Sequence, residues 1–303
     1  MKNFGRDSLG NVEIYLAEPN EQVREGMRGI MRDYGMKRTR SFARLTDLVN
    51  AIKESPPDLL IAADDTDPKL FDTIRDIRHS RIGVNPFIMI SLMVRAEADG
   101  TAVKRAILAG ADDVMVKPVA PARMLDRVAH VTMNRQPFIV TNDYLGPERR
   151  TAQPTRPSAI RQLDVVNTLR DTIEGRRMSP GELMRAVQAN MNEVMAARLD
   201  SNGLKLAWVC GNILKAYQEK RIDQSLHEQL LVLVGVLEDA GRTANALREP
   251  DLAAICIQMA REVEEMAEGY ENPTSLQLGT IQKLSKAFEL ARAAKAANAA
   301  QAG

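Results

Sequence analysis

The feature that most constrains the fold is a regular alternation of short apolar runs and longer amphipathic runs between residues 11 and 135. The short runs cover residues 12–17, 59–63, 86–91 and 113–116, and a weaker run at 40–42 is placed mainly by the alternating order. Near-continuous apolar strands separated by helices predict a parallel sheet that is covered on both faces. We therefore expect a five-stranded, doubly wound α/β domain over residues 10–135, with ligands at the carboxyl ends of its strands.

The alternation is lost between residues 136 and 158. Proline and glycine punctuate this stretch at Pro137, Gly146, Pro147, Pro154 and Pro157. Such residues interrupt helices and strands, so we expect a flexible linker between two domains.

Residues 159–297 show only helical periodicity. One apolar stripe runs through Ile160, Leu163, Val166, Leu169 and Ile173. A capping box at Ser179–Glu182, with proline at the first helical position, opens a second helix that we expect to stop at Asn202–Gly203. Further helices are expected over 204–219, 224–247, 251–270 and 274–297. Several amphipathic helices with short connections predict an all-α helical bundle domain.

Charge and composition narrow the functional class. The chain carries 41 basic and 40 acidic residues, so no overall field favours binding to nucleic acid or to an anionic membrane. Its two cysteines lie in apolar helical patterns, which is typical of structural thiols in a reducing compartment. The mixed charge of residues 1–10 does not match a secretory signal, and we find no apolar run long enough for a membrane span. We expect a cytoplasmic protein.

Three segments resemble one known family. The sequence AGADDVMVKP at residues 109–118 resembles the fifth strand and Lys-Pro turn of response-regulator receiver domains. Residues 23–26 (VREG) resemble the start of the first receiver helix, and residues 57–61 (PDLLI) the run into the third strand. The resemblance covers the whole of residues 10–135 and implies a flavodoxin-like receiver fold in a two-component phosphorelay.

The resemblance also implies a set of site residues. In receivers, an acidic pair after the first strand and an aspartate after the third bind Mg²⁺, and that aspartate accepts a phosphoryl group from phosphohistidine. A hydroxyl after the fourth strand and the lysine of the Lys-Pro turn hold the transferred group. Metal and lysine neutralise charge in a reaction that otherwise depends on positioning. The resemblance assigns Glu18, Ser91 and Lys117 to three of these positions.

The sequence departs from the receiver pattern at three positions. Pro19 replaces the second acidic residue and offers no side-chain oxygen. Counting from Pro57 places the phosphoacceptor position on Ala63, with Asp64 one residue later and so on the other face of a regular strand. Val114 stands where many receivers have an aromatic residue that couples phosphorylation to the output face. We expect a pseudo-receiver without bound metal or cofactor; Mg²⁺ at Glu18 and Asp64 belongs only to the alternative in which Asp64 is phosphorylated.

The segment Tyr-Leu-Gly-Pro-Glu-Arg-Arg at residues 144–150 stands out within the expected linker. It resembles tails that follow receiver-like domains in some bacterial proteins. Two interpretations remain open. Tyr144, Arg149 and Arg150 form a docking peptide for an acidic partner surface, or they belong to a solvated linker.

These observations predict a bacterial signal-transduction protein that works through protein–protein interaction. We find no Gly-rich phosphate loop, no Ser–His–Asp signature and no His/Cys cluster, so we do not expect an enzyme or a zinc site. The expected partners are signalling proteins, such as a sensor kinase or another regulator, or a second copy of the chain. The alternative is a phosphorylatable response regulator that uses Asp64 and a helical output domain.

Overall fold

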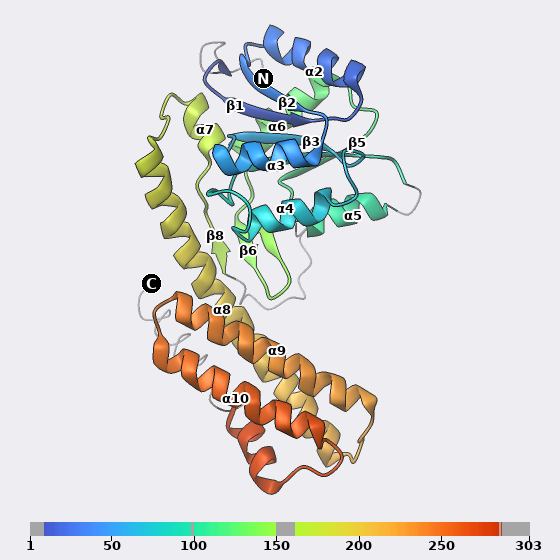
Figure 1. Ribbon diagram of the computed structural model, residues 1–303, viewed down its shortest axis with the longest axis vertical. Helices are drawn as coiled ribbons and strands as arrows, with labels where there is room; N and C mark the ends of the chain where they lie inside the picture. Colours follow the sequence, from blue (N-terminus) through green and yellow to red (C-terminus); the bar gives the residue numbers. More distant parts are fainter. Residues whose placement is uncertain (1–8, 98–99, 150–160, 285, 287–303) are drawn as a thin grey trace. The chain divides into compact units, whose positions relative to one another are not determined.

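The computed structural model describes residues 9–97, 100–149, 161–284 and 286. These residues belong to two compact units, which divide between Met191 and Asn192. In the first unit, strands and helices alternate in the order β1 (Glu13–Ala17), α2 (Glu21–Asp33), β2 (Arg38–Phe42), α3 (Leu45–Glu54), β3 (Leu59–Ala63), α4 (Leu70–Arg78), β4 (Met89–Val94), α5 (Thr101–Leu108), β5 (Asp113–Val116) and α6 (Pro121–Met133) (Figure 1).

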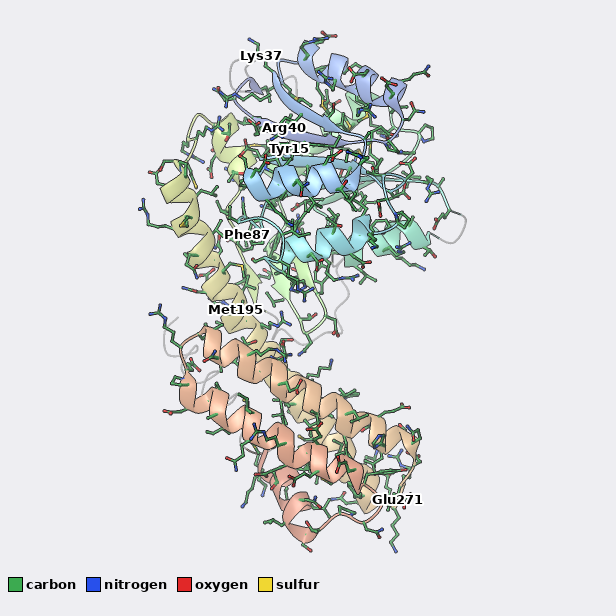
Figure 2. All side chains as sticks on the ribbon, viewed as in Figure 1. Tyr15, Lys37, Arg40, Phe87, Met195 and Glu271 are labelled. Carbon is green, nitrogen blue, oxygen red and sulfur yellow. The ribbon has the colours of Figure 1, made fainter. Side chains whose placement is uncertain are left out.

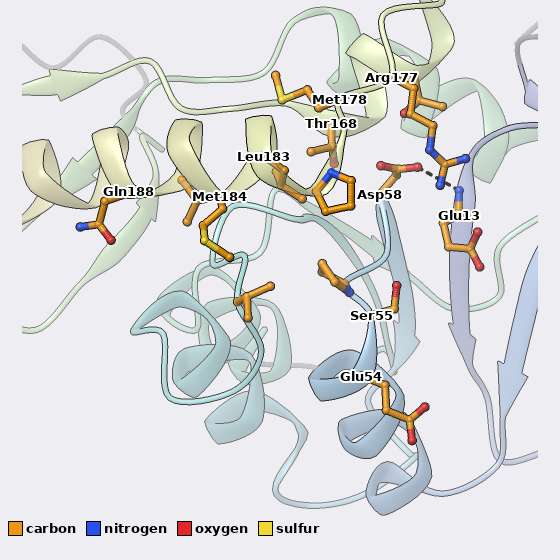
Figure 3. Close-up of a pocket in the computed structure, with 15 residues that line it drawn as sticks. Glu13, Glu54, Ser55, Asp58, Thr168, Arg177, Met178, Leu183, Met184 and Gln188 are labelled. Atoms are coloured by element: carbon orange, nitrogen blue, oxygen red, sulfur yellow. Dashed lines mark hydrogen bonds between the residues drawn. The ribbon is translucent and has the colours of Figure 1, made fainter.

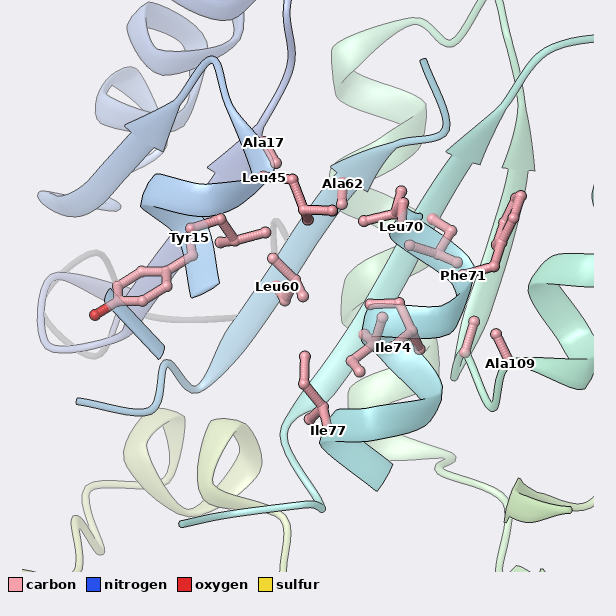
Figure 4. Packing of buried hydrophobic residues seen from close by; sticks show 14 of the residues in the cluster. Tyr15, Ala17, Leu45, Leu60, Ala62, Leu70, Phe71, Ile74, Ile77 and Ala109 are labelled. Atoms are coloured by element: carbon pink, nitrogen blue, oxygen red, sulfur yellow. The ribbon is translucent and has the colours of Figure 1, made fainter. Parts of the chain in front are cut away.

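The five strands form one parallel sheet in the order β2-β1-β3-β4-β5, which confirms the predicted doubly wound, flavodoxin-like architecture. Alternate residues of each strand point to opposite faces. Leu60 and Ala62 pack with the apolar sides of α3, α4 and α5 (Figure 4), whereas Ile61 and Ala63 pack with α2 and α6. Because both faces are covered, the buried strands are apolar along their whole length.

The outer strand β2 is protected by charged side chains. Arg40 extends over the ring of Tyr15 in β1, 5.1 Å from its centroid, and donates a 2.9 Å hydrogen bond to the Tyr15 hydroxyl (Figure 2). Charged residues on an edge strand oppose pairing with another chain. In the described part of the chain β2 is therefore the edge strand, and its charged side chains disfavour the addition of a further strand.

The expected linker is partly folded. Within it, β6 (Phe138–Val140) and β7 (Leu145–Pro147) pair with each other, and β6 also pairs with β8 (Gln162–Leu163) in a small antiparallel sheet. Phe138 is completely buried and stacks edge-on with Phe87, with ring centroids 5.8 Å apart. The prediction of a flexible segment is wrong for residues 138–147, because their apolar side chains are buried against the α/β core; residues 150–158 lie outside the described part of the chain.

Two of the predicted helix boundaries also change. The apolar stripe of residues 160–173 is not one helix: Leu163 lies in β8, and only α7 (Thr168–Ile173) is helical. The helix expected to stop at Asn202–Gly203 continues as α8 (Pro180–Gln218). Asn202 is completely buried and donates a 3.1 Å hydrogen bond to Asp239, so it anchors the helix where a turn was expected. One interior glycine costs a helix only about 1 kcal/mol.

The second unit consists of helices, as predicted, although it begins at Asn192 and not at residue 159. It contains the second part of α8, α9 (Gln224–Ala246), α10 (Pro250–Glu268) and a helical segment over 275–284. Their apolar sides share one core, which includes Ile213, Leu233 and Val263. Arg198 of α8 and Asp239 of α9 form a bidentate ion pair at 2.8 and 2.9 Å beside this core. Among the described helices of the chain, none combines the length and apolar character that a membrane span needs.

Candidate functional site

Four charged residues occupy equivalent places in the first unit: each directly follows the last residue of a strand. Glu18 follows β1, Asp64 follows β3, Arg95 follows β4 and Lys117 follows β5. Because the carboxyl ends of parallel strands lie at one edge of the sheet, the fold collects these side chains in one region. This is the edge where doubly wound sheets bind their ligands.

Asp64 is nearly inaccessible to solvent, with 7 % of its surface exposed. Its Oδ2 accepts hydrogen bonds from the backbone amide of Arg95 at 3.2 Å and from the Arg95 Nε at 3.4 Å. Its Oδ1 is buried and has no hydrogen-bond partner among the described residues. Arg95 therefore neutralises the carboxylate on one side, while the other oxygen is screened from solvent.

Lys117 forms the second ion-pair group of the site. Its Nζ donates to Glu18 Oε2 at 3.1 Å and to Asp65 Oδ1 at 2.9 Å. Burial lowers the pKa of Lys117, but the hydrogen bonds and charges of Asp65 and Glu18 outweigh that effect, and the net shift of its pKa is upward. Glu18, which is almost fully buried, also accepts from the Asn20 amide at 3.0 Å. Both oxygens of the Glu18 carboxylate are thus engaged by neighbours within the chain.

Ser91, which the resemblance assigns to the hydroxyl position, does not lie at the end of its strand. Ser91 lies inside β4, opposite Ile61 and Asp113 of the flanking strands, and only 1 % of its surface is exposed. Its Oγ donates to Asp113 Oδ2 at 3.3 Å. The strand continues through three further apolar residues, so the side chain that reaches the site from β4 is that of Arg95.

Ala63 also lies inside a strand, where it belongs to the apolar core on the α2 and α6 face. The first side chain beyond β3 is that of Asp64, and the assignment of the phosphoacceptor position to Ala63 stays a prediction. Val114 lies within β5 and is half-buried against the core on the opposite face. That Val114 replaces the aromatic residue by which many receivers couple phosphorylation to the output face stays a prediction.

Sequence reasoning missed Arg95, although a signal for it was present. The apolar run that begins at Phe87 does not end at Ser91; it continues through Leu92, Met93 and Val94 before the first charged residue. A single serine does not end a buried strand when its hydroxyl finds a partner inside the sheet. Extending the strand to the first charge would have placed Arg95 at the site.

The Mg²⁺ that the receiver resemblance implies does not fit these residues. Pro19 supplies only its carbonyl oxygen, and that oxygen already accepts a 3.2 Å hydrogen bond from Arg24 Nη1. Lys117 engages the Glu18 carboxylate, and Arg95 engages that of Asp64. Within the described ranges, no three His, Cys, Asp or Glu side chains converge as a metal site. Each of these carboxylates is already paired with a cation of the chain itself.

The segment at residues 144–149 is anchored to the α/β unit. The Tyr144 hydroxyl donates to the Pro147 carbonyl at 2.8 Å, and burial raises the pKa of Tyr144 to about 12. Arg149 donates from Nη2 to the carbonyl oxygen of Ala111. Arg149 thus ties the segment to the turn before β5, while Tyr144 closes a turn within the segment; Arg150 lies outside the described residues.

Comparison with known proteins adds no family assignment: no protein-family description matches the chain, and no curated protein matches it significantly in sequence.

Proposed function

We propose that the first unit is a receiver-like interaction module of a bacterial signal-transduction protein, and that its former phosphoryl site no longer accepts a phosphoryl group. The strand order β2-β1-β3-β4-β5 and the placement of Glu18, Asp64 and Lys117 directly after strands support the likeness to receivers. The paired state of these residues supports the loss of phosphorylation.

The observation that carries this proposal is the pairing of Asp64 with Arg95, which occupies one oxygen of the carboxylate. A carboxylate that attacks a phosphoryl group must present an oxygen to the donor. In this chain, one Asp64 oxygen is bonded to Arg95 and the other is screened from solvent. Arg95 and Lys117 together supply two positive charges to the carboxylates of Glu18, Asp64 and Asp65. The cluster therefore stabilises the strand ends without a metal or a phosphoryl group.

The interaction surface that we propose lies on α5, β5 and α6. Apolar side chains remain exposed there: Leu108 at 60 %, Val116 at 47 % and Met133 at 38 % of their surface. Burial of these side chains against a partner would remove apolar surface from water. The partner in this proposal is another signalling protein, and the helical unit supplies a second surface.

The test is treatment of the full-length protein with Mg²⁺ and acetyl phosphate, and separately with Mg²⁺ and beryllofluoride. We expect no phosphoryl adduct in the intact mass spectrum. We also expect no beryllofluoride-dependent shift of the methyl resonances of Met93 and Met115, which lie in the core beside β3 and β5. A stoichiometric adduct on Asp64 would refute the proposal.

A gain-of-function variant sharpens this test. In the double variant Pro19→Asp/Arg95→Thr, a metal ligand is introduced and the guanidinium that covers Asp64 is removed. We expect this variant to acquire beryllofluoride-dependent shifts at Met93 and Met115. The matched control is Arg81→Thr, which removes an exposed arginine paired with Asp76 at 2.8 Å and should leave both resonances unchanged.

The second candidate function is that of a phosphorylatable regulator that uses Asp64. It is favoured by one observation: Asp64, and not Ala63, directly follows β3, as Lys117 directly follows β5. This function predicts Mg²⁺-dependent labelling of the wild-type protein by acetyl phosphate, with loss of the label in Asp64→Asn.

A further inference from the structure

The first unit contains a cleft of about 480 Å³ at the opposite, amino-terminal ends of the strands (Figure 3). Glu13, the first residue of β1, and Asp58, which precedes β3, lie at one end of it. The first turns of α8 form a wall that includes Leu183, on the side of Asp58, and Met184. A volume of this size is within the range of clefts that bind small molecules.

One end of the cleft is acidic. The residues that line the cleft include three carboxylates, those of Glu13, Glu54 and Asp58, and one guanidinium, that of Arg177; a second guanidinium, that of Arg38, pairs with Glu13 at 3.9 Å, so the carboxylates outnumber the cations by one. Asp58 Oδ2 accepts a 2.9 Å hydrogen bond from the Glu13 amide, and Arg177 Nη1 donates at 3.1 Å to the carbonyl oxygen of Asn11. Glu54 is exposed at the end of α3. The balance of charge at this end favours a positively charged group.

The remaining wall is apolar and is exposed to an unusual degree. Val84 has 63 % and Met184 has 71 % of its surface exposed to solvent. Leu183, Val187 and Met178 line the same cleft. Unbranched methionine side chains adapt to ligands of different shape. An apolar wall next to a group of carboxylates suits a molecule with an apolar body and a cationic head.

The helix that forms this wall is hydrogen-bonded to the segment before α7 and is capped at its first turn, so we expect the cleft to be preformed. Asn190 of α8 accepts a 2.8 Å hydrogen bond from the Val166 amide and donates at 3.2 Å to the Asp164 carbonyl. At the start of the helix, Ser179 and Glu182 form a reciprocal capping box at 2.7 to 3.4 Å. A preformed cleft does not have to order its own walls when a ligand binds.

From this arrangement we infer that the cleft is a binding site for a small amphipathic organic cation, whose amine or guanidinium group lies at Glu13, Glu54 and Asp58 while its apolar body lies against Val84 and Met184. The site lies at the opposite strand ends from Asp64 and does not depend on whether that residue is phosphorylated. It therefore adds a ligand-binding function to the proposed interaction module.

The experiment uses the full-length protein with ¹³C-methyl-labelled methionine, because Met178 and Met184 both line the cleft and report on it directly. The probes are octylguanidinium, 1-octanol and octanoate, which share one apolar tail and differ in head-group charge. We expect octylguanidinium to shift both resonances saturably and to bind about tenfold more tightly than 1-octanol, with octanoate binding more weakly still.

Two variants separate the contribution of the head group from that of the tail. Glu54→Gln should weaken octylguanidinium binding about fivefold, the effect of one exposed ion pair, and leave 1-octanol unaffected. Met184→Ala, at a site too exposed to disturb folding, should weaken all three probes, with Met178 as the remaining reporter. The matched control Glu21→Gln, an exposed carboxylate in the first turn of α2, should change none of them.

The inference is overturned if octylguanidinium causes no saturable shift at Met178 and Met184. It is also overturned if the three probes bind equally, or if Glu54→Gln and Glu21→Gln have the same effect. These outcomes are independent of the beryllofluoride result, which reports on the opposite ends of the strands.

Discussion

Replacing Asp112 by alanine is expected to destabilise the first unit by about 3–5 kcal/mol, because it leaves two buried guanidinium groups without their shared counter-ion. Asp112 Oδ2 accepts from Arg78 Nη2 and Oδ1 from Arg135 Nε, both at 2.8 Å. Arg78 is completely buried, and its remaining donors bond to the carbonyl oxygens of Gly110, Pro86 and Ile88 at 2.7 to 2.9 Å.

This network joins the α/β sheet to the small antiparallel sheet that follows it. The Phe138 ring of β6 lies against both guanidinium groups, 5.2 Å from Arg78 Cζ and 4.8 Å from Arg135 Cζ. Burial lowers the pKa of Arg78 to about 10, against the opposing effect of Asp112, so Arg78 remains charged at neutral pH. Loss of the carboxylate should therefore loosen β6 and β7 as well as β4 and β5.

The network also predicts the direction of the pH dependence. Burial raises the pKa of Asp112, but the guanidinium groups of Arg135 and Arg78 outweigh it, so the folded-state pKa lies below the ordinary value. The resulting stabilisation is complete above the pKa of the unfolded chain and is lost as the pH falls through the lower, folded-state pKa. The difference in stability between wild type and Asp112→Asn should accordingly be largest near neutral pH and shrink in acid.

The measurement is native-state hydrogen exchange of amides in β4 and β5, because a chain of two units need not unfold in a single step. Asp72→Ala is the matched control: it removes an exposed carboxylate paired with Arg75 at 3.0 Å, and it should cost less than about 1 kcal/mol. A loss below about 1 kcal/mol for Asp112→Ala as well would contradict the role given to the network.

The second large effect is expected for Gly110→Ala, which should destabilise the same unit by about 3 kcal/mol. Gly110 has a φ of +92°, and a Cβ added there would lie 2.7 Å from the Leu145 carbonyl oxygen and 3.0 Å from Arg78 Cγ. At the facing position, a Cβ on Gly146 would lie 2.8 Å from the Cα of Gly110. The two backbones approach so closely that neither glycine leaves room for a side chain.

Gly100→Ala provides the matched control for this prediction. Its φ of +67° is also left-handed, but among the described residues nothing lies within 4 Å of an added Cβ. We expect it to cost about 1 kcal/mol, the effect of backbone strain alone. Urea unfolding, read from the amides of β5 and β7, distinguishes the two variants; equal losses would mean that the contact with β7 contributes nothing.

The local pattern of residues was enough to predict the α/β sheet and its order of elements. Buried parallel strands must be apolar throughout, so the runs at 59–63 and 113–116 are visible without any tertiary information. The strand ends were harder to place: β4 passes Ser91 because that hydroxyl finds Asp113 inside the sheet. An error of a few residues at that end was enough to hide Arg95 from the predicted site.

The segment at residues 138–149 and the boundary between the units could not be predicted for a different reason. The prolines and glycines of this segment suggested a linker. Gly146, however, lies so close to Gly110 that no side chain fits there, and the Phe138 ring packs against two guanidinium groups. Such contacts join residues far apart in the chain and leave no local periodicity. The layers of the fold and the charges available to the site follow from local patterns in the chain, because burial and helix or strand period act locally. Which of these charges meet depends on the folded chain, since Arg95 pairs with Asp64 through the registry of β3 and β4 and not through any motif.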